Sequence, residues 1–498
     1  MKLWALHCLA LCLLFRSGLS QTVVKSLPGL PGDLPFHLET GSAKPPISLN
    51  AVVTLVNTPD RSSDQDAYIG VGELEDVQLF YYFVESERSP KDDPLVLWLT
   101  GGPGCSALSG LLYEIGPFTF DYENSTRLRP TLRLNPYSWT KVANIIFLDQ
   151  PVGAGFSYAN SWESYNINDI VSAAETYEFL RKWLILHTEF LSNPLYIAGD
   201  SYSGFIVPMV TLQVAKGNEA GLEPRMNLEA LISQELYESA NIDCNGDYIN
   251  VDESNVDCVN DLKVVTECLE NVYMANILEP NCLYATPKST MGDVWDSSLI
   301  NEDRTLVPFP SMEAPRVWCR SYNYLYSYTW ASDKVVQDAL HVREETIEKW
   351  VRCNETLSYT YIVKEVIDIH KDLIKRGFRV LIYSGDHDMV IPYVGTQAWI
   401  DTLNLTISQD WHAWFVDGQV AGSISDKLSR HPCICAYFIE LGSYLFDKSQ
   451  LFVLTLVTSS CRKCNVNSFV QGGGHTAPEY KPKECFAMIN RWFDYFYI

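Results

Sequence analysis

Four short apolar runs constrain the fold of this 498-residue chain more than any other feature. PLVLWL (94–99), NIIFLD (144–149), LYIAG (195–199) and RVLIYS (379–384) show no alternation of apolar and polar residues, as expected for strands that are covered on both faces. Helical patterns lie between them, and in 170–186 apolar residues recur every three or four positions. Strands that alternate with helices predict a doubly wound, mostly parallel α/β sheet.

One segment departs from this alternation. Residues 228–325 are richer in cysteine and acidic residues, helical at first and then loop-like, which is typical of an inserted cap. We therefore expect an α/β core that the cap interrupts. The predicted organisation is a signal peptide (1–20), the first part of the core (21–227), the inserted cap (228–325) and the second part of the core (326–498).

The start of the chain indicates the secretory pathway. MKLWALHCLALCLLF has one lysine and then an apolar run too short to span a bilayer, as in a cleavable signal peptide. No later segment has 18 consecutive apolar residues, so we expect no membrane anchor. The net charge of −24 disfavours binding to nucleic acid or anionic membranes and suits an acidic compartment. We expect a vacuolar or extracellular protein with glycosylation sequons at Asn124, Asn354 and Asn404.

The cysteines fit the same compartment. Twelve of them follow the signal peptide, and in a secreted chain they are first interpreted as disulfide partners. Four have a spacing that also suits zinc: Cys433, Cys435, Cys461 and Cys464. Because no other feature supports a metal, we expect neither a metal nor a cofactor.

The hexapeptide GDSYSG (199–204) places a serine between a strand and a helix. By itself it fits a plain turn as well as a nucleophile elbow, which needs a histidine base, an acid and backbone donors for an oxyanion. In α/β-hydrolases the chain order is serine, acid, histidine. GDHDMVIP (385–392) follows one strand-like run and GGGHTAPEY (472–480) another, while the glycine-rich GGPGCS (101–106) follows PLVLWLT. His387 has the features of a solvated loop residue, whereas His475 lies in a glycine-rich turn.

At these positions the sequence closely resembles the serine carboxypeptidase-like family of α/β-hydrolases. The matching blocks, in order over most of the chain, are WLTGGPGCSALSGLLYEIGPF (98–118), IIFLDQPVGAGFSY (145–158), GDSYSG, YSGDHDMVIP and GGGHTAPEY. The resemblance implies that Ser201 is the nucleophile, Asp388 the orienting acid and His475 the base. It also implies an oxyanion hole from the N–H groups of Gly102 and Tyr202. Three disulfides are implied as well: Cys105–Cys319, Cys244–Cys258 and Cys268–Cys282.

The acceptor of the acyl group depends on four positions that the resemblance assigns to substrate binding: Thr100, Gly101, Glu114 and Asp200. Peptidase members carry Asn in place of Thr100 and Glu in place of Asp200, and use them with a glutamate matching Glu114 to bind a peptide carboxylate. Losing such contacts weakens selection of peptides. The chain resembles the plant acyltransferase branch, which implies a glucose-ester acyl donor and a small-metabolite acceptor. The alternatives are a carboxypeptidase acting on peptide C-termini and a secreted binding protein that retains the triad without turnover.

Three departures from the family pattern bear on activity. Residues 42–67 and a segment between SDKL (425–428) and SFVQGGGH are extra, and the strand expected after the elbow helix is missing. Residues 229–240 resemble the entry to the cap, so only 221–228 remain to replace that strand, and they include Pro224. We therefore expect the sheet to be broken or thinned beside the strand that leads to Ser201.

Overall fold

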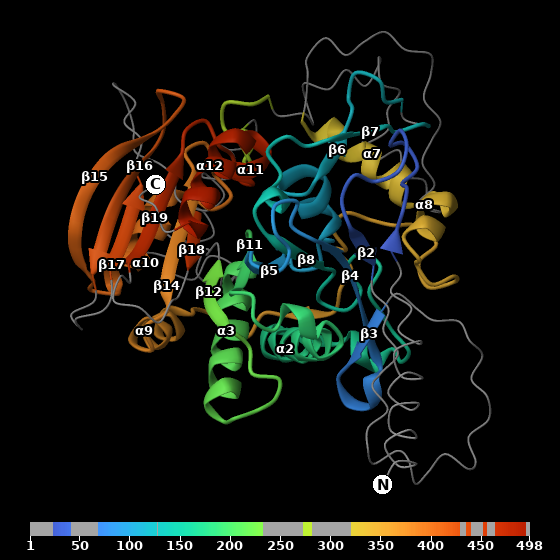
Figure 1. Ribbon diagram of the computed structural model, residues 1–498, viewed down its shortest axis with the longest axis horizontal. Coiled ribbons are helices and arrows are strands. Elements are labelled where there is room, and N and C mark those ends of the chain that lie inside the picture. Colours follow the sequence, from blue (N-terminus) through green and yellow to red (C-terminus); the bar gives the residue numbers. More distant parts are fainter. Residues whose placement is uncertain are drawn as a thin grey trace, which may run out of the picture.

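The computed structural model describes residues 23–40, 68–126, 128–232, 272–280, 320–428, 435–439, 452–455 and 464–494. One large sheet runs through these residues, with helices on both of its faces (Figure 1). Its strand order is β1 (Val23–Val24), β2 (Leu38–Thr40), β4 (Val77–Val84), β8 (Asn144–Leu148), β5 (Leu95–Leu99), β11 (Leu195–Gly199), β12 (Leu228–Ile232), β14 (Arg379–Gly385), β18 (Phe452–Thr455), β19 (Cys464–Val470), β16 (Gln419–Leu428) and β15 (Thr406–Val416).

Shorter strands add to this sheet or pair outside it. Three pair with strands of the main sheet: β3 (Tyr68–Val71) and β9 (Tyr158–Ala159) with β4, and β17 (Cys435–Ile439) with β19. Two separate ribbons are β6 (Phe118–Phe120) with β7 (Leu132–Leu134), and β10 (Ile167–Asn168) with β13 (Tyr359–Thr360).

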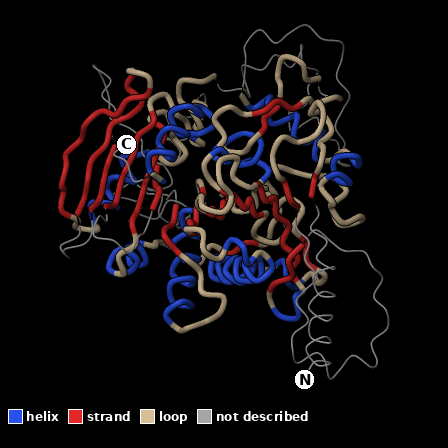
Figure 2. The backbone as a smooth tube through the Cα atoms, in the orientation of Figure 1, coloured by secondary structure: helices blue, strands red, loops and turns tan. Residues whose placement is uncertain are grey.

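The longer helices lie in two layers (Figure 2). The α-helices are α2 (Asp169–Leu186), α3 (Ser203–Glu219), α7 (Ser321–Ala331), α8 (Lys334–Ala339), α9 (Ile367–Lys375), α10 (Tyr393–Thr402), α11 (Ala477–Tyr480) and α12 (Pro482–Phe493). Single turns are η2 (Glu73–Glu75), η4 (Trp139–Lys141), η5 (Glu163–Tyr165) and η6 (Thr188–Phe190), with a π-turn at η3 (Gly110–Glu114).

The centre of the sheet is parallel and dry. β8, β5, β11, β12, β14 and β19 are parallel to their neighbours in this group, and every residue of β5, β8 and β11 is buried. Along β5, Val96 and Trp98 face a cluster that includes α12, whereas Leu95 and Leu97 face a cluster formed with α2 and α3. Burial on both faces explains why these strands lack alternation. The predicted α/β-hydrolase class is confirmed.

The sheet beside the Ser201 strand is not broken, but it is thinner there than between β5 and its neighbours, so only the break that we expected as one of two outcomes is wrong. Residues 228–232, which we assigned to the cap, form β12 and lie in the sheet between β11 and β14. Three residue pairs join β12 to each neighbour, with one register shift at Leu195/Tyr196. The substitute strand is LEALI itself, which shares only its first residue with the 221–228 segment and whose apolar residues suit a buried strand.

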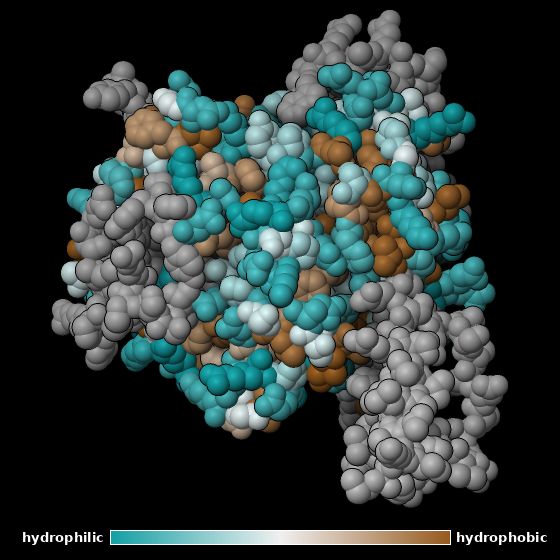
Figure 3. All heavy atoms as spheres, viewed as in Figure 1, coloured by the Kyte–Doolittle hydropathy of each residue, from teal (hydrophilic) through white to brown (hydrophobic). Residues whose placement is uncertain are grey.

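Several predictions lie outside the described residues, including the signal peptide, residues 42–67 and most of the cap. Of the cap, residues 272–280, β12 and the start of α7 are described. Within the described residues no helix is both long and apolar enough to cross a bilayer. Figure 3 shows a face on which polar residues predominate and apolar ones are interspersed, in keeping with the net charge of −24.

Candidate active site

Ser201 stands in a strained turn between β11 and α3. Its φ of 51° lies in the left-handed region, which residues other than glycine seldom adopt. The turn lies so close to the neighbouring chain that two positions, one in the turn and one beside it, have no room for a side chain. A Cβ on Gly199 would lie 2.3 Å from the carbonyl oxygen of Leu99, and a Cβ on Gly101 would lie 2.6 Å from Cβ of Ser201. This strand–turn–helix geometry is that of a nucleophile elbow rather than a plain turn.

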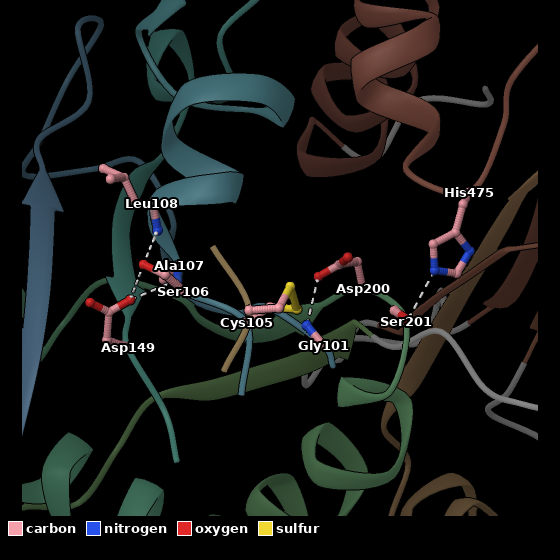
Figure 4. The surroundings of a disulfide bond; sticks show 10 residues. Gly101, Cys105, Ser106, Ala107, Leu108, Asp149, Asp200, Ser201 and His475 are labelled. Carbon is pink, nitrogen blue, oxygen red and sulfur yellow. Dashed lines mark hydrogen bonds between the residues drawn. A yellow bond between two sulfur atoms is a disulfide. The ribbon is translucent and has the colours of Figure 1, made fainter. Parts of the chain in front are cut away.

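The serine is the first member of a hydrogen-bond chain. Nε2 of His475 lies 2.9 Å from Oγ of Ser201, and Nδ1 of His475 lies 2.9 Å from Oδ2 of Asp388 (Figure 4 shows the His475–Ser201 contact). Ser201 follows β11, Asp388 follows β14 and His475 follows β19, so the three residues meet at the carboxyl ends of parallel strands. The structure thus brings together all three residues predicted to form the triad.

The carboxylate of Asp388 is completely buried and accepts hydrogen bonds from the backbone. Oδ1 of Asp388 accepts hydrogen bonds from the N–H groups of Val390 and Ile391, which leaves Oδ2 for His475. The neighbouring Asp386 instead accepts from the N–H of Gly472. This difference separates the two aspartates of GDHD: Asp388 bonds to the ring of His475, and Asp386 ties its own loop to the loop that carries His475.

Burial and charge set the protonation of the site. Burial alone lowers the pKa of His475, but the Asp388 carboxylate and then the Asp200 carboxylate outweigh it, so the pKa of His475 is raised. Burial raises the pKa of Asp200 to about 6, although His475 and the N–H of Gly101 act in the opposite direction. An imidazole with a raised pKa accepts a proton readily, as a general base must.

The predicted oxyanion donors lie beside the nucleophile. Gly102 has a φ of 120°, which only glycine adopts readily, and a Cβ built on Gly101 would lie 2.7 Å from the N atom of Tyr202. Within the described part of the chain neither the N–H of Gly102 nor that of Tyr202 donates a hydrogen bond. Both amides are therefore available to an oxyanion formed at Ser201.

The loop that carries Gly102 is anchored by a buried carboxylate that our sequence reasoning did not identify. Oδ1 of Asp149, at the end of β8, accepts from Oγ of Ser106 and from N of Ala107, both at 2.7 Å (Figure 4). Its Oδ2 accepts from N of Phe156 at 2.9 Å. A Cβ on Gly155 would lie 2.0 Å from Oδ2 of Asp149, so only glycine allows this approach. The sequence feature that could have identified Asp149 is its position directly after the buried strand in the block IIFLDQP.

A disulfide anchors the same loop, and here the predicted partner is wrong. Cys105 is bonded to Cys353, not to Cys319, which lies outside the described residues. The N–H of Ser106 donates to the carbonyl of Arg352 and the N–H of Asn354 donates to the carbonyl of Gly104, so the segments around the two cysteines run side by side. The pairs Cys244–Cys258 and Cys268–Cys282 lie outside the described residues.

Of the four residues predicted to bind substrate, Thr100 and Gly101 line a small pocket, whereas Glu114 and Asp200 are buried nearby. Thr100 is 5% exposed, and its hydroxyl has no hydrogen-bond partner among the described residues. Oδ1 of Asp200 accepts from the N–H of Gly101 at 3.2 Å. Glu114 is buried, and burial, followed by the charges of Asp200 and Glu479, raises its pKa well above the usual range. Glu114 and Asp200 therefore form an acidic pair that readily holds a proton.

A further buried aspartate, Asp169, joins Tyr202 to the segment 359–363. Asp169, at the start of α2, accepts from the hydroxyls of Tyr202 and Tyr359 and from the backbone N–H groups of Ile362 and Val363. Thr100, Gly101, Tyr202 and Tyr359 line a small pocket together with Gln150 and Ser172. No sequence pattern indicates this cluster, because its members come from distant segments.

The predicted glycosylation sites differ in exposure. Asn124 and Asn404 are exposed, while Asn354 is partly buried and its side-chain amide donates to the carbonyl of Gly153. The first two are accessible positions, and the third contributes to the contacts beside the Cys105–Cys353 disulfide.

Comparison with known proteins places this geometry in a family. Residues 56–232 and 229–431 match the family model described as serine carboxypeptidase. The chain is 38% identical to serine carboxypeptidase-like 1 of Arabidopsis thaliana, covering 95% of this chain and 92% of that protein. It is 37% identical to serine carboxypeptidase-like 19 of the same plant, covering 95% and 94%. A prohormone-processing carboxypeptidase from Saccharomyces cerevisiae has a similar fold, with a TM-score of 0.59, 18% identity and 95% coverage of each chain.

Proposed function

The chain belongs to the serine carboxypeptidase family, and from that premise we propose that it is a secretory-pathway acyltransferase of the vacuole or the extracellular space. It takes an acyl group from a 1-O-β-glucose ester and delivers it to a small metabolite. The reaction proceeds through an acyl-serine at Ser201. The observation that carries the acyl-serine step is the continuous Ser201–His475–Asp388 hydrogen-bond chain.

In the first half-reaction His475 removes the hydroxyl proton of Ser201 as Oγ attacks the ester carbonyl. The N–H groups of Gly102 and Tyr202 donate to the developing oxyanion. Protonated His475, which Asp388 stabilises, then returns the proton to the departing glucose oxygen. In the second half-reaction His475 deprotonates the acceptor hydroxyl, whose oxygen attacks the acyl-serine, and Ser201 recovers its proton.

The choice of acceptor is supported by Thr100 and Asp200. Thr100 offers a short hydroxyl in place of an amide, and the carboxylate of Asp200 bonds back to Gly101. Neither reaches outward as a longer amide or glutamate side chain does. A site that lacks matched hydrogen bonds to a peptide carboxylate discriminates weakly in its favour. Release of glucose and transfer to an alcohol need no such carboxylate contact.

Carboxypeptidase activity is the second candidate, because one observation favours it. Glu114 and Asp200 are buried together and both have raised pKa values, Asp200 to about 6. In mildly acidic solution such a pair holds a proton and can donate to a peptide's terminal carboxylate. The third candidate, an inactive binding protein, loses its main argument because β12 closes the sheet beside Ser201.

The test is to offer the purified protein blocked dipeptides and a panel of glucose esters with hydroxylated acceptors, and to identify the products by mass spectrometry. We expect acyl transfer from a glucose ester to exceed peptide cleavage. Efficient dipeptide cleavage with the esters untouched would instead establish the peptidase. The double variant Thr100→Asn with Asp200→Glu should raise peptidase activity several-fold, while Ser201→Ala serves as the background control for both reactions.

A further inference from the structure

A short piece of the predicted cap bonds to both of the loops that carry the acid and the base of the triad. We call residues 273–279 the strap, residues 386–389 the acid loop and residues 472–475 the base loop. The carbonyl of Met274 accepts from the N–H of Met389 at 2.8 Å, and the N–H of Ile277 donates to the carbonyl of His387 at 2.9 Å. The strap therefore bonds to the residue on each side of Asp388.

The strap also bonds to the base itself. The carbonyl of Ala275 accepts from the backbone N–H of His475 at 2.7 Å. The two loops are joined directly as well, because the N–H of His387 donates to the carbonyl of Gly473 at 2.9 Å. The acid loop, the base loop and the strap thus form a three-way junction of backbone hydrogen bonds around the His475–Asp388 pair.

The junction is packed so closely that glycines are required. A Cβ on Gly474 would lie 2.3 Å from the carbonyl oxygen of Ala275 and 2.9 Å from Cβ of Asn276. A Cβ on Gly385 would lie 2.3 Å from the carbonyl oxygen of Gly473. Because real Cβ atoms do not approach other atoms this closely, a shift of the strap is transmitted directly to the base loop.

Side chains hold the strap in its shape. Asn276 is 3% exposed, and its Oδ1 accepts from the N–H of Leu278, which closes the turn. At the end of the strap the carboxylate of Glu279 forms an ion pair with Arg320, with a closest N–O distance of 2.7 Å. Arg320 also lies 3.5 Å from Glu479, next to the base loop, and stacks over the ring of Tyr480.

We propose that the strap is a positioning element that holds Asp388 and His475 in register with Ser201. The inference rests on the proposed roles of these three residues. Ser201 comes from β11, and β12 separates that strand from β14, so the sheet alone does not fix the acid loop against the nucleophile. Catalytic groups need to be placed within about 0.5 Å, and a displacement of about 1 Å costs on the order of 100-fold in rate. Three backbone bonds from the strap supply that accuracy.

Asn276→Ala is the direct test, since it keeps the Cβ that packs on Gly474 and removes only the turn-closing amide. We expect kcat to fall about tenfold while KM for the acyl donor stays unchanged, because no residue of the strap lines the pocket formed by Thr100, Gly101 and Tyr202. Asn276→Ser should recover most of the loss, because a hydroxyl can accept from the N–H of Leu278. Asn193→Ala is the matched control.

Asn193 is 2% exposed and joins two loops at the opposite end of β11, where it donates to the carbonyls of Pro90 and Asp93. Its removal should lower Tm as much as Asn276→Ala does and leave kcat intact. Wild-type kcat in Asn276→Ala, or an equal loss of kcat in Asn193→Ala, would overturn the proposal.

Amide hydrogen exchange on the unmodified protein gives a second test that needs neither a variant nor turnover. We expect the amides of Ile277, Met389 and His475 to be protected and to exchange at one common rate, as a single opening unit. Exchange of the His475 amide at the rate of an exposed loop would overturn the proposal. If the protein turned over none of the tested substrates, the proposed function would fail while this result still decided the role of the strap.

Discussion

Ser201 lies on one half of the sheet and its partners Asp388 and His475 lie on the other half. The two halves are stabilised in different ways. In the first half β5 pairs with β8 and with β11 over five residues each without a register shift, and a disulfide and Asp149 fix the loop above them. In the second half β14 is joined to the first by the short β12, through three pairs on each side. Its loops are fixed by backbone bonds from the strap.

This difference indicates where each kind of damage should appear. Buried side chains in the first half stabilise the fold and also hold the loop 101–107 that carries Gly102, which we call the oxyanion loop. Their loss should therefore reduce both stability and activity. The second half depends on the placement of two loops, so changes there should cost activity more than stability. Replacing one aspartate by asparagine in each half compares the two regions with the same chemical change.

The largest effect should come from Asp388→Asn in the second half. The amide oxygen can still accept from Val390 and Ile391, which leaves the NH2 group facing Nδ1 of His475. A donor at that place selects the wrong tautomer of the histidine, so we expect kcat to fall about 10⁴-fold with little change in Tm. Steady-state kinetics with a glucose ester, alongside thermal unfolding, measures both quantities. A loss below tenfold would show that Asp388 does not orient the base.

Asp149→Asn, in the first half, should have a smaller effect on rate and a larger one on stability. Its two oxygens accept from Ser106, Ala107 and Phe156, so an amide must direct NH2 at a buried donor. We expect a loss of about 1–3 kcal/mol in unfolding free energy and a fall in kcat of about tenfold, because the oxyanion loop shifts. Urea unfolding and steady-state kinetics, each at one fixed pH for the wild type and the variant, measure the two quantities.

Asp93→Asn is the matched control for this change. Asp93 is buried, and its Oδ2 accepts from Oγ of Ser86 and the N–H of Ser89 while its Oδ1 accepts from the Arg88 guanidinium, at the opposite end of the strands from the loop that carries Gly102. It should lose comparable stability and keep its kcat. If Asp149→Asn and Asp93→Asn reduced kcat equally, the special connection between Asp149 and the oxyanion loop would be refuted.

The smallest effect is a pH-dependent change in stability at Glu39, near the edge of the first half. Glu39 is buried, yet bonds from His187, His37 and Tyr81 overcome the effect of burial and lower its pKa to about 2. A carboxylate with a lowered folded pKa stabilises the protein above its unfolded pKa of about 4.5, and this contribution is lost as pH falls towards 2. Glu39→Gln should cost about 1–3 kcal/mol at pH 5 and progressively less below pH 4. A difference that stayed constant from pH 7 to pH 3 would contradict this interpretation.

The first half of the site was the easier part to predict. PLVLWL, NIIFLD and LYIAG are uninterrupted apolar runs because both faces of β5, β8 and β11 are buried, and the turns after two of them carry the glycines that the elbow needs. Cys105 was assigned to the wrong partner, since its pairing with Cys353 depends on two distant segments lying side by side.

The second half shows the limits of such reasoning. β12 was missed because LEALI was interpreted as the entry to the cap rather than as a strand. The strap acts through the carbonyls of Met274 and Ala275 and the N–H of Ile277, and backbone groups leave no signature in the residue types. Contacts made by backbone groups therefore cannot be predicted from the residue types and are recognised only in the structure.

The central claim, an acyl group carried by Ser201, is tested most directly by trapping that intermediate. The protein is mixed with a glucose ester, quenched with acid within a turnover, digested and mapped by mass spectrometry. We expect the acyl mass on the peptide that contains Ser201, its disappearance when a hydroxylated acceptor is added before the quench, and no acylation of Ser201→Ala. An acyl group on another residue, or turnover with no acylated peptide, would contradict the account.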